Sequence, residues 1–292
     1  YIQIKKKIEQ IDEKHPVIYL TREANAFPLY SQFSSIAGIS HWKSKNPWEL
    51  GHILKTHIKF ANGQHLWAIG PAFVFGSGAP IWNSAPEIRL MINLAISSGA
   101  RGWLSYTYHN IPLWSGGECQ RSLTGPFLTF SDVWEELGGR LGRFYSLASL
   151  VMSAKPTNPP DFSPDIQSRK HPRSRCPDNV DILLHTWMKG ENFWLFYLVN
   201  QDTSEVTGTN VNFRSALPEQ YRAYDATQFV RSYKWEELPM SFHREMFPGQ
   251  GQIILIATPE ECQRWGEIIM QRIFNYIEQQ IFINVELLKP YV

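Results

Sequence analysis

The 292-residue sequence predicts an α/β region followed by an all-β region. Two observations lead to this prediction. From residue 1 to about residue 153, helix-like and strand-like patterns alternate, which is typical of a parallel sheet wound with helices. From Val180 the apolar residues alternate with a period of two, and no comparable helix follows until Pro259, which indicates a small antiparallel β-sandwich. Between the two regions, residues 155–178 contain six prolines.

The first region is expected to hold a parallel sheet of four strands. The expected strands are Val17–Thr21, Ile36–Ser40, Leu66–Phe73 and Gly102–Tyr108. The expected helices carry apolar residues at helical spacing: Ile4 to Ile11, Leu29 to Phe33, Pro47 to Ile58 after the cap residue Asn46, Pro86 to Ala95 after Ser84 or Ala85, and one long helix from about Ser131 to Val151. Four strands with their helices in about 150 residues make half of an eight-stranded (β/α)8 barrel. A complete four-stranded open sheet is the competing interpretation.

The second region begins after a break in the pattern. Because proline disrupts regular structure, we expect residues 155–178 to form a linker or long surface loop, with the basic residues between Arg169 and Arg175 facing solvent. A hairpin is expected around Lys189–Asn192. The other expected elements are short strands at 206–213, 221–224, 228–233 and 252–257, and a helix from Pro259 to about Gln280.

The expected domain organisation follows from these patterns. Residues 1–153 form half of a barrel, 154–178 the linker or loop, and 179–258 the sandwich. Residues 259–292 form a helix that either packs back on the sandwich or opens a further domain. The chain begins at Tyr1, inside a helical pattern and without a methionine, so we expect a segment to precede it.

Composition narrows the functional classes. A net charge of +1 gives no reason to expect nucleic acid, and no apolar run approaches membrane-spanning length. The three cysteines, Cys119, Cys176 and Cys262, show no metal-ligand spacing, and no phosphate-binding loop is present, so no metal and no cofactor are expected. Aromatic residues make up 14% of the chain, with 11 tryptophans, which is consistent with core packing or with a ring-bearing ligand such as a carbohydrate. Composition leaves the compartment open, with a secreted or periplasmic location among the alternatives, and it leaves the oligomeric state open.

Three stretches carry a resemblance to a known family. Leu66–Phe73, Ala85–Met91 and Gly99–Tyr106 resemble strand seven, helix seven and strand eight of a (β/α)8-barrel glycoside hydrolase. The strands around Trp187 and Tyr197 resemble the start of the β-sandwich that follows the barrel in such enzymes. The resemblance implies the carboxyl-terminal half of the barrel, a carbohydrate ligand and hydrolysis of a glycosidic bond by two carboxyl groups.

The catalytic carboxylates of the clan that this barrel resembles lie at the ends of strands four and seven. Strand four would precede Tyr1, and the end of strand seven reads Gly70–Phe73, which contains no carboxylate. Glu23, after the first strand, is the best-placed catalytic candidate, whereas Glu87 is explained by its place in the first turn of a helix. The candidate substrate-binding residues follow strand ends or lie in loops on the same side: Asn25, His41, Trp42, Trp82, Tyr106, Tyr108, His109 and Trp114.

Three functions remain open at this point. The leading hypothesis is a glycoside hydrolase or close relative, represented here without its amino-terminal barrel half. The alternative is a non-catalytic carbohydrate-binding or scaffold protein with a degenerate barrel. A third interpretation is a stand-alone α/β module, joined to a sandwich, that acts through protein contacts.

Overall fold

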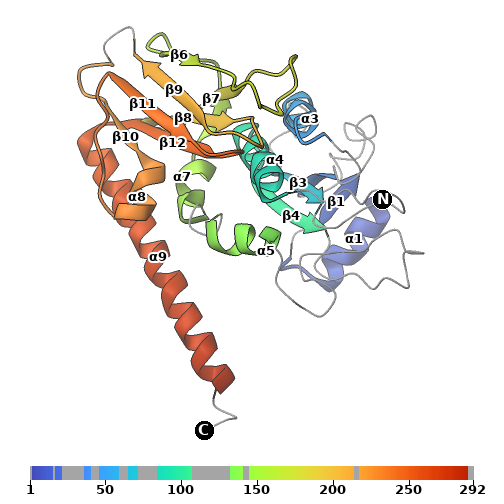
Figure 1. Cartoon of the computed structure of the whole chain (residues 1–292). Coiled ribbons are helices and arrows are strands. Elements are labelled where there is room, and N and C mark those ends of the chain that lie inside the picture. The colour runs from blue at the N-terminus through green and yellow to red at the C-terminus, as the bar shows by residue number, and fades with distance from the viewer. Residues whose placement is uncertain are drawn as a thin grey trace.

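The computed structural model describes residues 2–15, 17–21, 36–40, 46–58, 65–71, 84–106, 132–140, 145–213 and 217–288. It confirms the predicted class, an α/β region followed by antiparallel sheets, and Figure 1 shows the two regions side by side.

The first region contains a parallel sheet of four strands in the order β1-β2-β3-β4. The strands are β1 (Ile18–Thr21), β2 (Ile36–Ser40), β3 (His65–Pro71) and β4 (Gly102–Tyr106). Each strand lies beside the next one in the sequence, with no reversal of direction across the sheet. This sequential order is typical of a barrel, because an open doubly wound sheet reverses its order at a switch point. The sheet is therefore consistent with part of a (β/α)8 barrel.

Helices cover one face of this sheet. They are α3 (Glu49–His57) and α4 (Ala85–Ser97), and α1 (Ile2–Ile11) precedes β1. A buried apolar cluster joins the sheet to α3 and α4, and its members include Ala37, Ile39, Leu66, Ala68, Leu50, Leu54, Ile88 and Met91. The inward faces predicted for these two helices are thus confirmed.

The helix α4 begins after Ser84, one of the two start positions, Ser84 or Ala85, that the sequence allowed. Oε2 of Glu87 accepts hydrogen bonds from the Ser84 backbone nitrogen at 2.7 Å and from the Ser84 hydroxyl at 3.1 Å. This is the reciprocal part of a capping box, and Pro86 lies in the same first turn, where its missing N–H costs nothing. Glu87 therefore has a structural role at the helix start, as the sequence indicated.

The predicted long helix from 131 to 151 is wrong as a single regular helix. The described residues form α5 (Asp132–Glu135), a π-helical turn (Glu136–Arg140), a 3-10 turn (Tyr145–Leu147) and α7 (Ala148–Met152). Two consecutive glycines, Gly138 and Gly139, lie in the π-helical turn, and glycine is a poor helix former. Of the residues expected to face inward, Val133 is buried and Leu137 packs partly buried against the same cluster, but the described backbone is not a uniform α-helix.

The second region consists of two antiparallel sheets packed face to face. The five-stranded sheet has the order β10-β12-β8-β7-β5 and the three-stranded sheet the order β11-β9-β6. The strand bounds are β5 (Lys155–Thr157), β6 (Asp165–Ser168), β7 (Leu183–Lys189), β8 (Phe193–Asn200), β9 (Thr207–Asn212), β10 (Arg222–Asp225), β11 (Ser241–Met246) and β12 (Gly251–Ala257). Between the sheets, Phe196 and Ile254 of one pack against Val211 and Phe242 of the other. The predicted hairpin is confirmed as the β7–β8 pair.

Two expectations for this region were wrong. The proline-rich segment contains two strands, because β5 pairs with β7 and β6 pairs with β9. Both strands are short and lie at sheet edges, which is where proline is tolerated. The expected strand at 228–233 is instead part of helix α8 (Ala226–Ser232), which begins at Asp225 and ends at Tyr233 in the left-handed conformation.

The other face of the five-stranded sheet is covered by helices α4, α7 and α9 (Pro259–Leu288). Cys262, Trp265 and Ile269 of α9 are buried in this cluster, so the first half of the helix packs back on the sandwich. The second half extends away from the rest of the molecule in Figure 1, and Phe274 and Tyr276 there are exposed. Because α4 contributes to the clusters on both sides of it, the two regions share one helix as a common layer.

Polar contacts fix α4 between the regions. The guanidinium of Arg89 donates two hydrogen bonds of 2.6 Å to the carboxylate of Glu136 and one of 2.7 Å to the Pro248 carbonyl. Asn93 donates to the Gly249 carbonyl at 2.9 Å and accepts from the Tyr197 hydroxyl at 2.6 Å. These buried bonds join α4 to the π-helical turn on one side and to the sandwich on the other.

Candidate functional site

The carboxyl ends of the four parallel strands lie at one edge of the sheet. In the register of the sheet, Thr21 lies beside Ile39, Ser40 beside Ile69, and Pro71 beside Tyr106. Neighbouring strands are ~4.8 Å apart, so the four ends span about 14 Å. In barrels and open α/β sheets alike, ligands bind at this edge.

Most of the predicted site residues follow these strand ends closely in the sequence. Tyr106 is the last residue of β4, and its backbone is described. The other predicted residues lie outside the described residues: Glu23, Asn25, His41, Trp42, Trp82, Tyr108, His109 and Trp114. Their roles, and the catalytic role of Glu23 in particular, therefore stay predictions.

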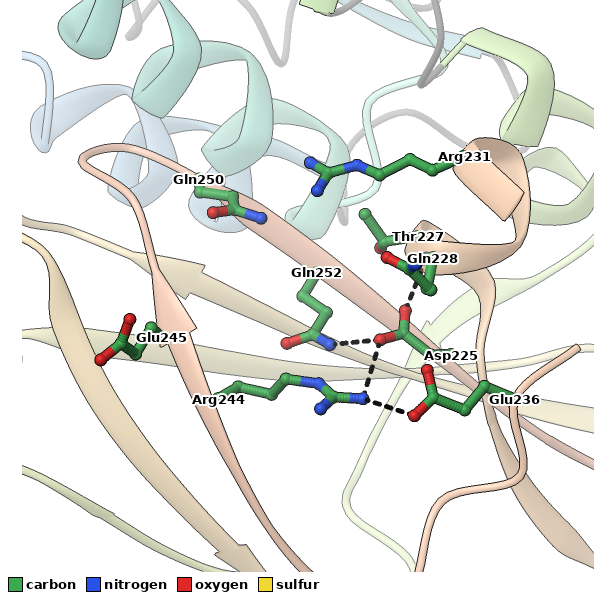
Figure 2. Close-up of a pocket in the computed structure, with 9 residues that line it drawn as sticks. All are labelled: Asp225, Thr227, Gln228, Arg231, Glu236, Arg244, Glu245, Gln250 and Gln252. Atoms are coloured by element: carbon green, nitrogen blue, oxygen red, sulfur yellow. Dashed lines mark hydrogen bonds and ion pairs between the residues drawn. The ribbon is translucent and has the colours of Figure 1, made fainter. Parts of the chain in front are cut away.

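A second candidate site lies in the sandwich and is a polar pocket of about 310 Å³ (Figure 2). Four neighbouring elements supply its lining: β10, α8, β11 and β12, with the loops beside them. The lining residues are all polar or charged: Asp225, Thr227, Gln228, Arg231, Glu236, Arg244, Glu245, Gln250 and Gln252. We call this the sandwich pocket.

Asp225 organises the floor of the sandwich pocket. One carboxylate oxygen accepts a hydrogen bond from the backbone nitrogen of Gln228 at 2.8 Å, which caps α8. The other accepts from Nε2 of Gln252 at 2.9 Å and from the Arg244 guanidinium at 3.3 Å. The Nη2 atom of Arg244 also lies 3.8 Å from Oε1 of Glu236. The buried carboxylate is thus fully bonded, which is the condition under which a buried charge is tolerated.

The sequence did not point to the sandwich pocket. Its residues come from segments whose pairing depends on the antiparallel register, and the expected strand at 228–233 hid the helix that forms one wall. A signal was present: Asp225 followed by Ala226 and Thr227 is a helix-start pattern, with a capping residue directly before a helix former.

Two other properties bear on the chemistry available. Within the described ranges, no three His, Cys, Asp or Glu side chains are grouped closely enough to hold a metal ion. Of the helices described, α9 included, none has both the length and the hydrophobicity to cross a membrane. The sandwich pocket, whose lining lies within the described residues, therefore offers no metal centre.

Comparison with known proteins gives similarities to solved structures only. No protein-family model matches the chain, and no curated protein matches it. A GH30 endoxylanase from Clostridium papyrosolvens C71 is 10% identical, with a TM-score of 0.43, over 88% of this chain and 59% of that one. An Anoxybacillus alpha-amylase is 8% identical, with a TM-score of 0.47, over 88% of this chain and 55% of that one.

A third similar structure is the GH51 arabinofuranosidase from Xanthomonas axonopodis pv. citri. It is 8% identical, with a TM-score of 0.40, over 88% of this chain and 63% of that one. The chain thus spans about 55–63% of the length of these three proteins. All three are glycoside hydrolases, and at these identities and scores the likeness does not extend to residues or activity.

Proposed function

We propose that this chain is the carboxyl-terminal half of a glycoside-hydrolase-like barrel with its β-sandwich, and that it acts on a carbohydrate. The observation that supports this most is the sequential parallel order β1-β2-β3-β4 together with the register of the strand ends. In the sequence, Glu23 follows β1 by two residues, His41 follows β2 directly and Tyr108 follows β4 by two residues. Because these residues follow the carboxyl ends of strands in the same sheet, their side chains would contact one ligand bound at that edge.

The second face of the parallel sheet also supports a larger barrel. Leu20 and Leu104 lie on the face opposite to the helices, because side chains alternate along a strand and Leu104 is the register partner of Ile69. Leu20 is 46% exposed and Leu104 is 37% exposed, whereas Ile36 and Ile69 of the same face are buried, so the face is only partly covered. Parallel sheets are normally buried on both faces. In the proposed protein, a second set of barrel strands covers this face.

The proposed mechanism uses two carboxyl groups. Glu23 is the proposed catalytic carboxylate of this half, and its partner comes from the other half of the barrel. Aromatic side chains at the strand ends and in the loops, Trp42 and Trp114 among them, would stack on the sugar ring, and His41, Tyr108 and His109 would bond its hydroxyl groups.

The experiment tests whether the full-length protein hydrolyses any glycan of a broad panel. Hydrolysis is measured as the release of reducing sugar. Glu23→Gln is expected to lower kcat by at least about 10³-fold, because a carboxyl group that acts on the bond is lost, while sugar affinity is retained. The matched control is Glu191→Gln, an exposed residue of the β7–β8 turn, which is expected to change neither. A full-length protein that hydrolyses no glycan in the panel contradicts the catalytic proposal.

A non-catalytic carbohydrate-binding protein is the second candidate. It is favoured by the end of β3, which reads Gly70–Pro71 where the resemblance requires a carboxylate. In that case no hydrolysis occurs, Glu23→Gln leaves sugar binding unchanged, and Trp114→Ala and Tyr108→Ala each weaken it. Absence of any sugar affinity by calorimetry contradicts both candidates.

A further inference from the structure

The sandwich pocket has a fixed polar floor. Asp225, Thr227 and Gln252 are 3%, 8% and 5% exposed. Asp225 holds Gln252 and the start of α8, as described above, and the Thr227 hydroxyl oxygen accepts a hydrogen bond of 2.7 Å from the Ile253 backbone nitrogen. These side chains are held in place before any ligand binds, so little conformational entropy is lost at the floor on binding.

Other groups of the same pocket are left with unused hydrogen-bonding capacity. Among the described residues, the side chains of Arg231, Gln228 and Glu245 have no hydrogen-bond or ion-pair partner. Figure 2 shows the Arg231 guanidinium reaching from α8 across the floor toward Gln250. Arginine offers only donors, a carboxylate only acceptors, and an amide both. A ligand that fits these groups must donate and accept hydrogen bonds at several positions.

The charges of the pocket nearly cancel. Three carboxylates and two guanidiniums line it, and Arg244 lies between the carboxylates of Asp225 and Glu236. A phosphate would need a clear excess of cations, and a divalent cation would need converging carboxylates, which the described residues do not form. The lining also lacks aromatic and aliphatic side chains, so a mainly apolar ligand is not favoured.

We propose that the sandwich pocket binds a small neutral polyhydroxylated ligand, one or two sugar rings in size. Its hydroxyl groups both donate and accept, and the pocket volume of about 310 Å³ is at the lower end for small-molecule sites. Vicinal hydroxyls match the planar guanidinium of Arg231 and the amide of Gln228. This site is separate from the sheet edge and does not depend on hydrolysis there.

The test is NMR titration of the protein, selectively labelled at its glutamine and arginine side chains, with glucose, xylose, arabinose and galactose up to ~10 mM, which occupies about nine-tenths of a site whose Kd is about 1 mM. At least one sugar is expected to shift the side-chain signals of Gln252 and Arg231. Arg231→Ala, which removes an exposed and unpartnered side chain, is expected to weaken this binding about tenfold. Arg173→Ala, an exposed arginine outside the pocket, is the matched control and is expected to leave it unchanged.

Inorganic phosphate and glucuronate are titrated in the same way, to test whether the pocket prefers an anion to a neutral sugar. Shifts with these anions and none with a neutral sugar overturn the proposal, as does neutral-sugar binding that survives Arg231→Ala. The residue-specific signals separate the two sites, because Gln252 and Arg231 line the sandwich pocket, and their shifts are expected to persist in Glu23→Gln whatever happens to hydrolysis.

Discussion

The two regions of the molecule differ in how completely their sheets are covered. The central strands β8 and β12 of the five-stranded sheet are buried along nearly their whole length, with helices on one face and the second sheet on the other. The parallel sheet is covered by α3 and α4 on one face. On its other face Leu20 and Leu104 are exposed, whereas Ile36 and Ile69 are buried. In α1, which precedes the sheet, Ile4, Ile8 and Ile11 are also exposed.

This difference in coverage indicates which region contributes most to the stability of the chain and which surface stays exposed. Buried apolar area is the main favourable contribution to folding, so the antiparallel region and the shared helix α4 are expected to dominate the stability of the chain. The exposed apolar residues of the parallel region are not explained by the contacts described. The proposal of a larger barrel accounts for them, because further barrel strands would cover this face.

The largest expected effect is at the joint between the regions. Glu136→Gln leaves the buried guanidinium of Arg89 without its charged partner, and we expect a loss of about 3–5 kcal/mol in the free energy of unfolding, measured by urea titration. The double variant Arg89→Met with Glu136→Leu removes both charges and is expected to recover most of that loss. A single variant as stable as the parent protein would mean that this ion pair does not stabilise the packing of α4 on the π-helical turn.

A pair of leucines compares the two sheets directly. Leu255 in β12 is fully buried, and Leu255→Ala is expected to cost about 2–5 kcal/mol of unfolding free energy. Leu104→Ala, on the open face of the parallel sheet, is expected to cost less than about 1 kcal/mol in this chain. In a longer form that carries the proposed remaining barrel strands, the cost at Leu104 is expected to rise toward that at Leu255. An equal, small cost in both forms would contradict the covering layer.

The sequence was most informative where a pattern is local. The start of α4 near Pro86, its inward stripe and the β7–β8 hairpin each depend on residues close together in the chain, and each was predicted. The parallel sheet followed from the alternation of such local patterns.

The failures have a common physical cause. Phe229 and Val230 are good strand formers, but the Asp225 cap and packing against Trp235 and the α9 core place them in a helix. The prolines of 155–178 exclude a helix or a central strand, yet they permit short edge strands once β7 and β9 offer partners. The sandwich pocket is assembled by the same long-range pairing, so local patterns could not reveal it.

The last expected effect is absent at neutral pH, appears only at alkaline pH and concerns the buried core of the antiparallel region. Burial raises the pKa of the Cys262 thiol to about 12 from an ordinary value near 9. Between these values the unfolded chain loses its proton while the folded chain keeps it, so the stability from this group is complete below pH 9 and falls as the pH rises toward 12. Cys262→Ala is therefore expected to flatten the decline in the free energy of unfolding between pH 9 and 11, measured by urea titration at each pH. Lost packing adds a cost that does not depend on pH.

Cys176 provides the comparison, because burial raises the pKa of its thiol to about 11. Cys176→Ala is expected to act in the same direction over a narrower pH range. If Cys262→Ala leaves the pH dependence of the unfolding free energy unchanged, the first half of α9 does not exclude water from this thiol. The antiparallel core would then be less different from the partly exposed parallel sheet than the burial of its side chains indicates.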